Sequence, residues 1–273
     1  MKKLLMSLAM VGFGLFLTAS QALAINTGIL VGDLQIQFQN ADVASVYTVS
    51  NPSMGDNKQD SFALITVTNI NTVLNNVNLW SQVSGVDTLT GMFYGLDDTS
   101  VNVANFGGGI FSQYITATGG YIDIYSKSSS IDSTTNNAPT LAQLAALGLS
   151  APVDQWQATG GSLYLRLAVV PGTYASTLTF DSNTGSIVGS SAAYLDVVGG
   201  SAAAQFDTNH QLNGADMYLY DSFSTNDLTA AQKAAGWSVG SGGNVLGTGV
   251  PEPASMTLLG LGLLGLVRSR RRG

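Results

Sequence analysis

The sequence predicts a mainly β fold, an antiparallel β-sandwich or jelly roll with one or two short helices. Three observations favour this class. Short runs such as residues 34–38 and 163–169 alternate apolar with polar side chains, and a period of two is that of a half-buried strand. Strand-favouring Val, Ile, Thr and Tyr are common in residues 25–249. Glycine-containing turns separate the runs, which is typical of antiparallel sheets.

The expected strands are the segments whose alternation is clearest. They are residues 34–38, 61–68, 163–169, 174–180 and 217–221. Two segments of identical sequence, 117–120 and 158–161, end in Gly-Gly. Because paired glycines supply the positive φ angles of a two-residue turn, we expect a hairpin at each. Pro171 and Gly172 predict a third tight turn.

Two short helices and one linker complete the expected body. Residues 139–147 start with proline and end before Gly148, as a short helix does. Thr229 and Gln232 have the spacing of a capping box at the start of a second helix. Residues 238–249 are rich in glycine, which predicts a flexible linker.

The N-terminal segment has the three parts of a secretory signal peptide. Lys2 and Lys3 precede an apolar run at residues 4–17, and small residues follow at Ala22 and Ala24. We therefore expect signal peptidase to cleave after Ala24, which gives a signal peptide at residues 1–24 and an ectodomain at residues 25–237.

The C-terminal segment, residues 250–273, also has three parts in a fixed order. Pro251, Glu252 and Pro253 come first, and two prolines keep that backbone extended. An apolar run at residues 254–267 follows, about 21 Å long as a helix against a hydrocarbon core of about 30 Å. The chain then ends in a basic cluster whose long side chains can reach the lipid headgroups: Arg268, Arg270, Arg271 and Arg272. We expect a membrane-inserting helix with its arginines on the cytoplasmic side.

This order of parts resembles the PEP-CTERM sorting signal, which exosortases recognise on exported proteins of Gram-negative bacteria. The resemblance implies transient anchoring in the inner membrane, processing by an exosortase at residues 251–253, and transfer to the cell surface or extracellular matrix. Proteins with this tail are associated with exopolysaccharide, biofilm or floc formation. The resemblance therefore implies a structural or adhesive role, with exopolysaccharide as a partner.

The charge of residues 25–249 restricts the partners further. This segment has four basic residues, 16 aspartates and no glutamate, a formal charge of −12. Nucleic acid is excluded because phosphate binding requires a basic face. Cations and neutral polymers suit such a surface better. The chain has no cysteine, which excludes disulfides and thiolate metal sites.

We expect no enzyme, because catalytic motifs are absent from the sequence. His210 is the single histidine, and its polar surroundings predict a surface loop. Scattered aspartates leave an extracellular polysaccharide hydrolase open as an alternative. A carbohydrate-binding module, calcium-dependent or not, is the alternative that ranks before the hydrolase, with aromatic platforms at Trp80, Trp156, Trp237 and the tyrosines.

Calcium is the one ion that the sequence suggests, and no other cofactor is expected. Asp181 with Asn183 and Asp207 with Asn209 each place two oxygen ligands two residues apart, which is how a calcium loop begins. Neither segment continues to a bidentate acid, so Asx turns at loop tips are the favoured interpretation.

Overall fold

The computed structural model describes residues 30–52, 54–83, 86–127, 133–150 and 161–250. Ten strands form one antiparallel sheet. Their bounds are β1 Gly32–Ala44, β2 Ser61–Thr72, β3 Asn78–Ser81, β4 Thr88–Gly107, β5 Ile110–Lys127, β6 Ser162–Val169, β7 Ala175–Asp181, β8 Ser186–Gly199, β9 Met217–Ser224 and β10 Val239–Gly249. Within the described residues, three short α-helices accompany the strands: α2 Leu141–Leu147, α3 Ala203–Phe206 and α4 Ala230–Ala234. The mainly β, antiparallel prediction is confirmed.

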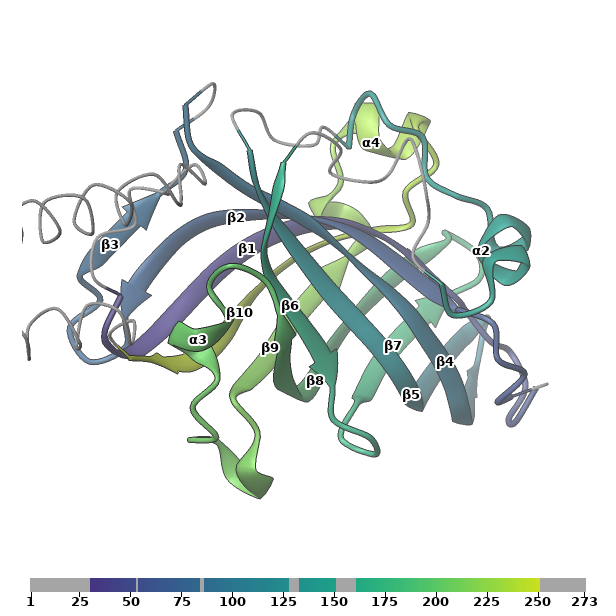
Figure 1. The fold of residues 1–273 in the computed structure, drawn as a ribbon. Helices are drawn as coiled ribbons and strands as arrows, with labels where there is room; N and C mark the ends of the chain where they lie inside the picture. Colours follow the sequence, from purple (N-terminus) through teal and green to yellow (C-terminus); the bar gives the residue numbers. More distant parts are fainter. Residues whose placement is uncertain (1–29, 53, 84–85, 128–132, 151–160, 251–273) are drawn as a thin grey trace, which may run out of the picture.

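The sheet closes on itself, because β1 pairs with β10 along one edge and with β2 along the other. Two of its rows contain a pair of strands each. β3 and β4 both pair with β2, and β6 and β7 both lie between β5 and β8. Eight rows therefore follow one another around the sheet in chain order, and Figure 1 shows them arching around a common interior.

This arrangement differs from the expected sandwich or jelly roll, in which two separate sheets face each other. Every strand here has a hydrogen-bonded neighbour on both sides over part of its length, except the short β3. The alternation of apolar and polar residues is the same in a sandwich and in a closed sheet. The hydrogen-bonded pairing of β1 with β10 distinguishes the two folds, because it joins the first and last strands and closes the sheet.

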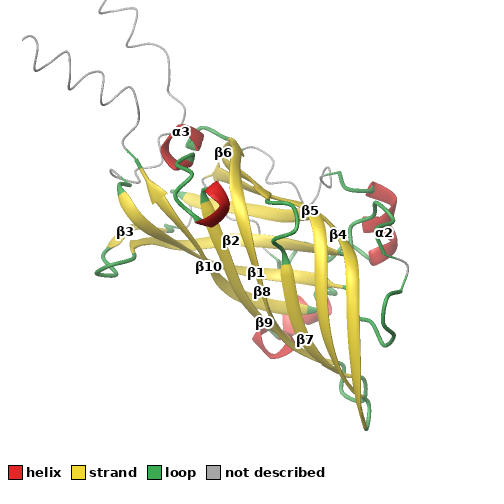
Figure 2. Ribbon diagram, turned by 90° about the horizontal axis from the view of Figure 1, so that it is seen from below, coloured by secondary structure: helices red, strands yellow, loops and turns green. Residues whose placement is uncertain are grey.

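Two apolar layers fill the interior. The first, called here the α3-end core, includes Leu34, Leu165, Leu195, Phe206 and Met217. The second, called the loop-end core, consists of Val101, Ile115, Leu178, Ile187, Phe223 and Val239. Residues of the β1–β2 connection pack against the loop-end core. α3 lies toward the end that carries β3, and α2 toward the other end (Figures 1 and 2).

A third apolar cluster lies on the outer face of β1, β2 and β4, beneath the helices. Phe62 stacks against Trp237 with ring centroids 6.2 Å apart, and Leu144 of α2 is fully buried beside them. The Trp237 Nε1 donates to the carbonyl oxygen of Ser133 at 2.8 Å. Both predicted helices are present, each with a capping box at its start, from Thr140 in α2 and from Thr229 in α4.

Two local predictions are wrong. Gly119 and Gly120 do not form a hairpin turn but lie inside β5, where the strand changes its partner from β7 to β6. The predicted tight turn at Pro171 and Gly172 is present, and it joins β6 to β7. Residues 239–249 are not a linker but β10, paired with β1 and β9.

The body of the protein consequently extends at least to Gly249, not to residue 237. The segment 158–161 lies mostly outside the described residues, as do Ala22, Ala24, the apolar run 254–267 and the terminal arginines. Among the residues that are described, no helix is long and apolar enough to cross a membrane.

Candidate functional site

The interior contains a cavity of about 90 Å³, and its wall combines polar side chains with residues of both apolar cores. We call it the interior cavity. Its wall includes side chains from β1, β2, β4, β5, β7, β8, β9 and β10. The polar groups in that wall are Asn40, Asp42, Ser45, Asp60, Ser61, Asp98, Tyr174, Ser176, Ser191 and Asp221. Carboxyl groups inside an apolar fold are costly unless they are paired or protonated.

Asp42 and Asp221 form the acidic side of the cavity. Asp42 follows the inward positions of Leu34 and Phe38 on β1, and Asp221 lies between Leu219 and Phe223 on β9. The strand alternation that buries these apolar neighbours therefore also turns the two carboxyl groups inward.

The Asp42 carboxylate is well supplied with hydrogen bonds. Its Oδ1 accepts from Asn40 Nδ2 at 2.7 Å, and its Oδ2 accepts from Ser241 Oγ at 2.8 Å. Burial still raises its pKa well above the usual range, and the charge of Asp221 raises the pKa further. Asp42 is partly buried and lies in the wall of the cavity.

The carboxyl group of Asp221 is less well supplied with hydrogen bonds than that of Asp42. Burial raises its pKa to about 7, although the Ser241 hydroxyl and a backbone amide favour the charged form. Its side chain is buried at 7 % relative exposure, and its Oδ1 has no hydrogen-bond partner among the described residues. The two carboxyl groups cannot both be charged at low cost, so near neutral pH the pair retains a proton.

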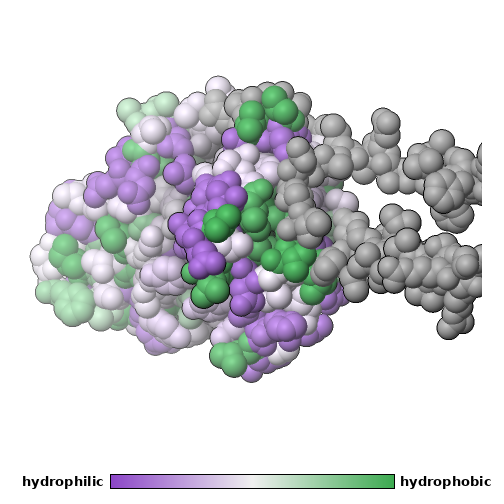
Figure 3. Space-filling view, turned by 90° about the vertical axis from the view of Figure 1, so that its left-hand side faces the viewer, coloured by the Kyte–Doolittle hydropathy of each residue, from purple (hydrophilic) through white to green (hydrophobic). Residues whose placement is uncertain are grey.

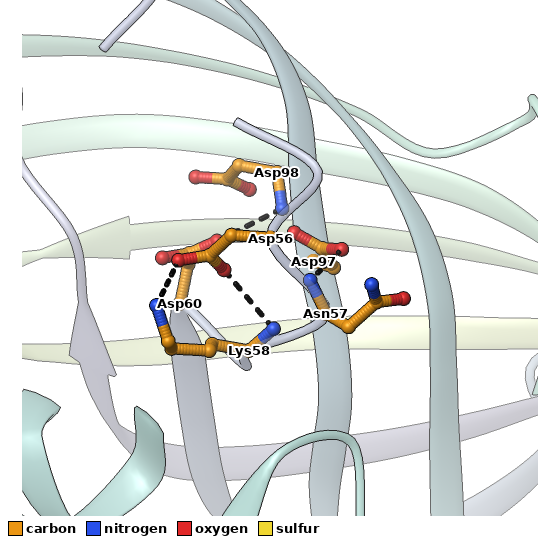
Figure 4. A network of polar contacts seen from close by, with 6 residues as sticks. All are labelled: Asp56, Asn57, Lys58, Asp60, Asp97 and Asp98. Atoms are coloured by element: carbon orange, nitrogen blue, oxygen red, sulfur yellow. Dashed lines mark hydrogen bonds and ion pairs between the residues drawn. The ribbon is translucent and has the colours of Figure 1, made fainter. Parts of the chain in front are cut away.

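A second acidic group, Asp98 of β4, lies elsewhere on the cavity wall. Burial and the charge of Asp60 raise its pKa to about 7. Its Oδ2 accepts a hydrogen bond from Tyr47 Oη at 2.9 Å, and its backbone amide donates to Asp60 Oδ2 at 2.9 Å. Figure 4 shows this contact between Asp98 and Asp60, and beside it the backbone amide of Asn57, which donates to Oδ2 of the adjacent Asp97 at 3.0 Å.

Tyr174 is the phenol of the interior cavity. Burial raises its pKa, and the charges of Asp98 and Asp221 both raise it further. The phenol therefore lies within electrostatic reach of both acidic groups. It remains protonated in the physiological range, and its hydroxyl can donate a hydrogen bond.

The outer face of the sheet carries a second feature, a cross-strand row of uncharged residues that we call the outer polar row. Neighbouring strands place these residues opposite one another: Asn102, Tyr114, Thr177, Ser190, Ser222, Gly242, Gln39 and Thr66. Tyr114 is 46 % exposed, and Tyr220, 49 % exposed, lies next to the row. On the face shown in Figure 3, hydrophobic residues lie in small groups separated by hydrophilic ones.

The calcium candidates form local turns. Asp181 Oδ1 accepts from the Asn183 backbone amide at 2.9 Å, and Thr184 Oγ1 donates to its Oδ2 at 2.9 Å. Asn209 Nδ2 donates to Asp207 Oδ1 at 3.4 Å. In the part of the chain that the structure describes, no group of three or more acidic or histidine side chains is placed to hold a metal ion.

The remaining predicted residues also have clear positions. His210 is exposed, with Nδ1 3.1 Å from the carbonyl oxygen of Thr208, as expected of a surface loop. Trp80 and Trp237 are buried at 4 % and 3 % exposure, so neither can be a glycan platform. Trp156 and residues 251–253 lie outside the described residues.

Sequence reasoning missed the acidic residues of the cavity. The signal was present on β1, where Asn40 and Asp42 continue the inward series of Leu34 and Phe38. A carboxyl group in phase with buried apolar residues is a candidate for an interior site. The convergence of Asp42, Asp98 and Asp221 depends on sheet closure, which the pattern does not reveal.

The fold and the cavity define a closed antiparallel sheet with a partly polar interior, and the C-terminal tail defines the route of the protein. Residues 249–272 match the PEP-CTERM protein-sorting motif. The chain is therefore an exported protein that an exosortase sorts to the cell surface. No curated protein matches the chain.

Proposed function

We propose that this protein is a non-enzymatic structural or adhesive component of the extracellular matrix of a Gram-negative bacterium. In this proposal it holds exopolysaccharide, in a biofilm or floc, against the outer face of its sheet. The sorting motif supports the location. The outer polar row, which combines hydroxyl and amide groups with exposed tyrosines, is the observation that carries the binding role.

The chemistry of this row suits a neutral polymer. Its members have no charge, and their hydroxyl and amide groups both donate and accept hydrogen bonds. Tyr114 and Tyr220 each offer an apolar ring and a polar tip. Their strands, β5 and β9, are three strand spacings apart, about 14 Å along the curved sheet, and Tyr220 lies two residues along β9 from Ser222 of the row. A polymer that extends across the strands can contact both rings.

A binding assay tests this proposal with the exported protein and the exopolysaccharide of its own cells. The Tyr114→Ala/Tyr220→Ala double variant is expected to bind the polymer at least tenfold more weakly. Phe106→Ala is the matched control, because Phe106 is 72 % exposed on β4 outside the row. Equal binding by the double variant, or release of new sugar ends during incubation, contradicts the proposal.

The sorting part has its own test, intact-mass analysis of the native protein after cell fractionation. We propose transient anchoring of the full tail in the inner membrane, then cleavage near residues 251–253. The expected surface species begins at Ile25 and ends within that segment. Replacement of Pro251 or Pro253 is expected to hold the protein in the inner membrane, and normal surface delivery of that variant contradicts this route.

A further inference from the structure

The interior cavity contains one acidic oxygen that the fold leaves without a partner. Asp221 Oδ1 is buried and accepts no hydrogen bond from the described residues, while both oxygens of its neighbour Asp42 accept one. Ser61 Oγ, also in the cavity wall, is buried without a partner as well. A buried acceptor without a donor is unfavourable, and more so when it is charged. The site therefore favours a ligand that brings donors.

The titratable groups in the cavity wall indicate whether the ligand is positively or negatively charged. Its titratable groups are four carboxyl groups and one phenol: Asp42, Asp60, Asp98, Asp221 and Tyr174. No lysine, arginine or histidine of the described chain lies in its wall. Arg166 is bound to Asp123, and Lys58 to Asp56. Negative charge in a poorly solvated space, without a basic side chain, favours a cation.

The rest of the wall is apolar, which indicates that the uncharged part of the ligand is a hydrocarbon group. Phe38, Phe93 and Phe223 lie in it together with Ile65, Leu178 and Leu219. Aliphatic and aromatic surface of this kind stabilises a hydrocarbon group by removing it from water. The benzene rings can also attract a positive charge at their faces.

We propose that the interior cavity binds a small primary ammonium compound, with the ammonium group beside Asp42 and Asp221 and the alkyl group against the phenylalanines. A volume of about 90 Å³ is smaller than the roughly 150 Å³ apolar cavity that holds benzene, so the ligand has about four or five non-hydrogen atoms. An ammonium group supplies three donors, one for Asp221 Oδ1 and the others for the neighbouring acceptors.

An inorganic cation fits this site less well. Calcium takes six to eight oxygen ligands, and the described residues include no cluster of three acidic side chains placed to hold a metal ion. A calcium ion also gains nothing from the phenylalanine side of the wall. The combination of a carboxyl pair and hydrocarbon surface distinguishes an organic cation.

Proton exchange gives the proposal a specific signature. The free carboxyl pair retains a proton near neutral pH, and the ammonium ion stabilises the fully charged pair. Binding at pH 6 therefore takes up the ammonium ion and releases about one proton to the buffer. The amine itself stays protonated at pH 6 and pH 8, since alkylammonium groups resemble lysine with a pKa near 10.4.

Isothermal titration of the exported protein with isobutylamine is the experiment. We expect saturable one-to-one binding that is about tenfold tighter at pH 8 than at pH 6, with proton release at pH 6 read from buffers of different ionisation enthalpy. Isobutanol has the same shape without the charge and is expected not to bind. Calcium chloride is titrated in parallel.

Two variants locate the site. Asp221→Asn keeps the shape of the side chain and removes its charge, and we expect at least a tenfold loss of isobutylamine binding. Asp207→Asn removes the same charge from an exposed loop and is expected to bind as the original protein does. If Asp221→Asn does not fold, the comparison of isobutylamine with isobutanol on the original protein decides alone.

The outcomes are separable. Equal binding of isobutanol, binding of calcium in place of the amine, no binding, or unchanged binding by Asp221→Asn each overturns the ammonium site. None of these results bears on the outer polar row, which is tested with polymer and with tyrosine variants.

Discussion

Arg166 on β6 and Asp123 on β5 form a two-point ion pair across neighbouring strands. Arg166 Nε donates to Asp123 Oδ1 and Nη2 donates to Oδ2, both at 2.6 Å. Asp123 is fully buried, and the phenols of Tyr94 and Tyr125 donate to its Oδ2 at 3.3 and 3.4 Å. The arginine thus neutralises a carboxylate that the fold encloses completely.

The first prediction concerns this pair. Arg166→Met keeps the apolar stem and removes the charge, which leaves the Asp123 carboxylate buried without a counter-ion. Loss of one partner of a buried pair costs about 3–5 kcal/mol, and because Arg166 is partly exposed we expect the lower part of that range. Urea denaturation measures the change. Lys58→Gln removes an exposed partner of Asp56 and is the control, with no measurable change expected.

The second prediction is that the free protein loses stability as the pH rises from about 4 to 7. Burial raises the folded-state pKa of Asp98 and of Asp221 to about 7, from the ordinary value of 3.8 for an aspartate. A raised pKa means that the folded state binds protons more tightly than the unfolded state. The resulting stability is fully present below the unfolded pKa and disappears as the pH passes the folded pKa.

Thermal unfolding between pH 4.5 and 8 measures this effect. We expect the melting temperature to fall by several degrees across the interval, and Asp221→Asn to reduce the fall. A melting temperature that rises steadily from pH 5 to pH 8 contradicts the protonated state of the cavity.

The third prediction concerns the glycine pair inside β5. Gly119 has φ +72°, and a Cβ there would lie 2.6 Å from the carbonyl oxygen of Gly95. Gly119→Ala therefore combines backbone strain with a clash against rigid backbone, and we expect a loss of more than about 2 kcal/mol. Gly172 has a similar φ of +77° with open space around it, so Gly172→Ala isolates the strain. Equal losses in urea denaturation contradict the role of close packing at Gly119.

Side-chain alternation in the sequence indicates which segments are strands, but it does not indicate which strands pair with each other. It located β1, β2, β6, β7 and β9. Flanking proline and glycine located α2, and the Thr229 capping box located α4. It could not show that β1 pairs with β10, because that contact joins residues about 200 positions apart. The acidic side of the cavity was hidden for the same reason, since Asp42 and Asp221 meet only when this part of the sheet forms.

The glycine content of residues 238–249 explains why this segment was predicted to be a flexible linker and not a strand. A Cβ at Gly243 of β10 would lie 2.6 Å from the carbonyl oxygen of Tyr220 and 2.8 Å from the ring of Phe38. The residue is small because its neighbours approach closely, not because the segment is flexible. Sequence composition does not separate these two uses of glycine.

The last prediction distinguishes a strand from a linker at β10. Val245 is 5 % exposed in the α3-end core, whereas its neighbour Asn244 faces the outer side of the sheet. Val245→Asp places an unpaired carboxyl group in an apolar layer, and we expect a loss of several kcal/mol or failure to fold. Asn244→Asp adds the same charge to the outer face and is expected to change stability by less than about 0.5 kcal/mol. Urea denaturation of the two variants gives the comparison. A flexible linker would tolerate both substitutions equally, so equal stability of the two proteins contradicts the paired strand.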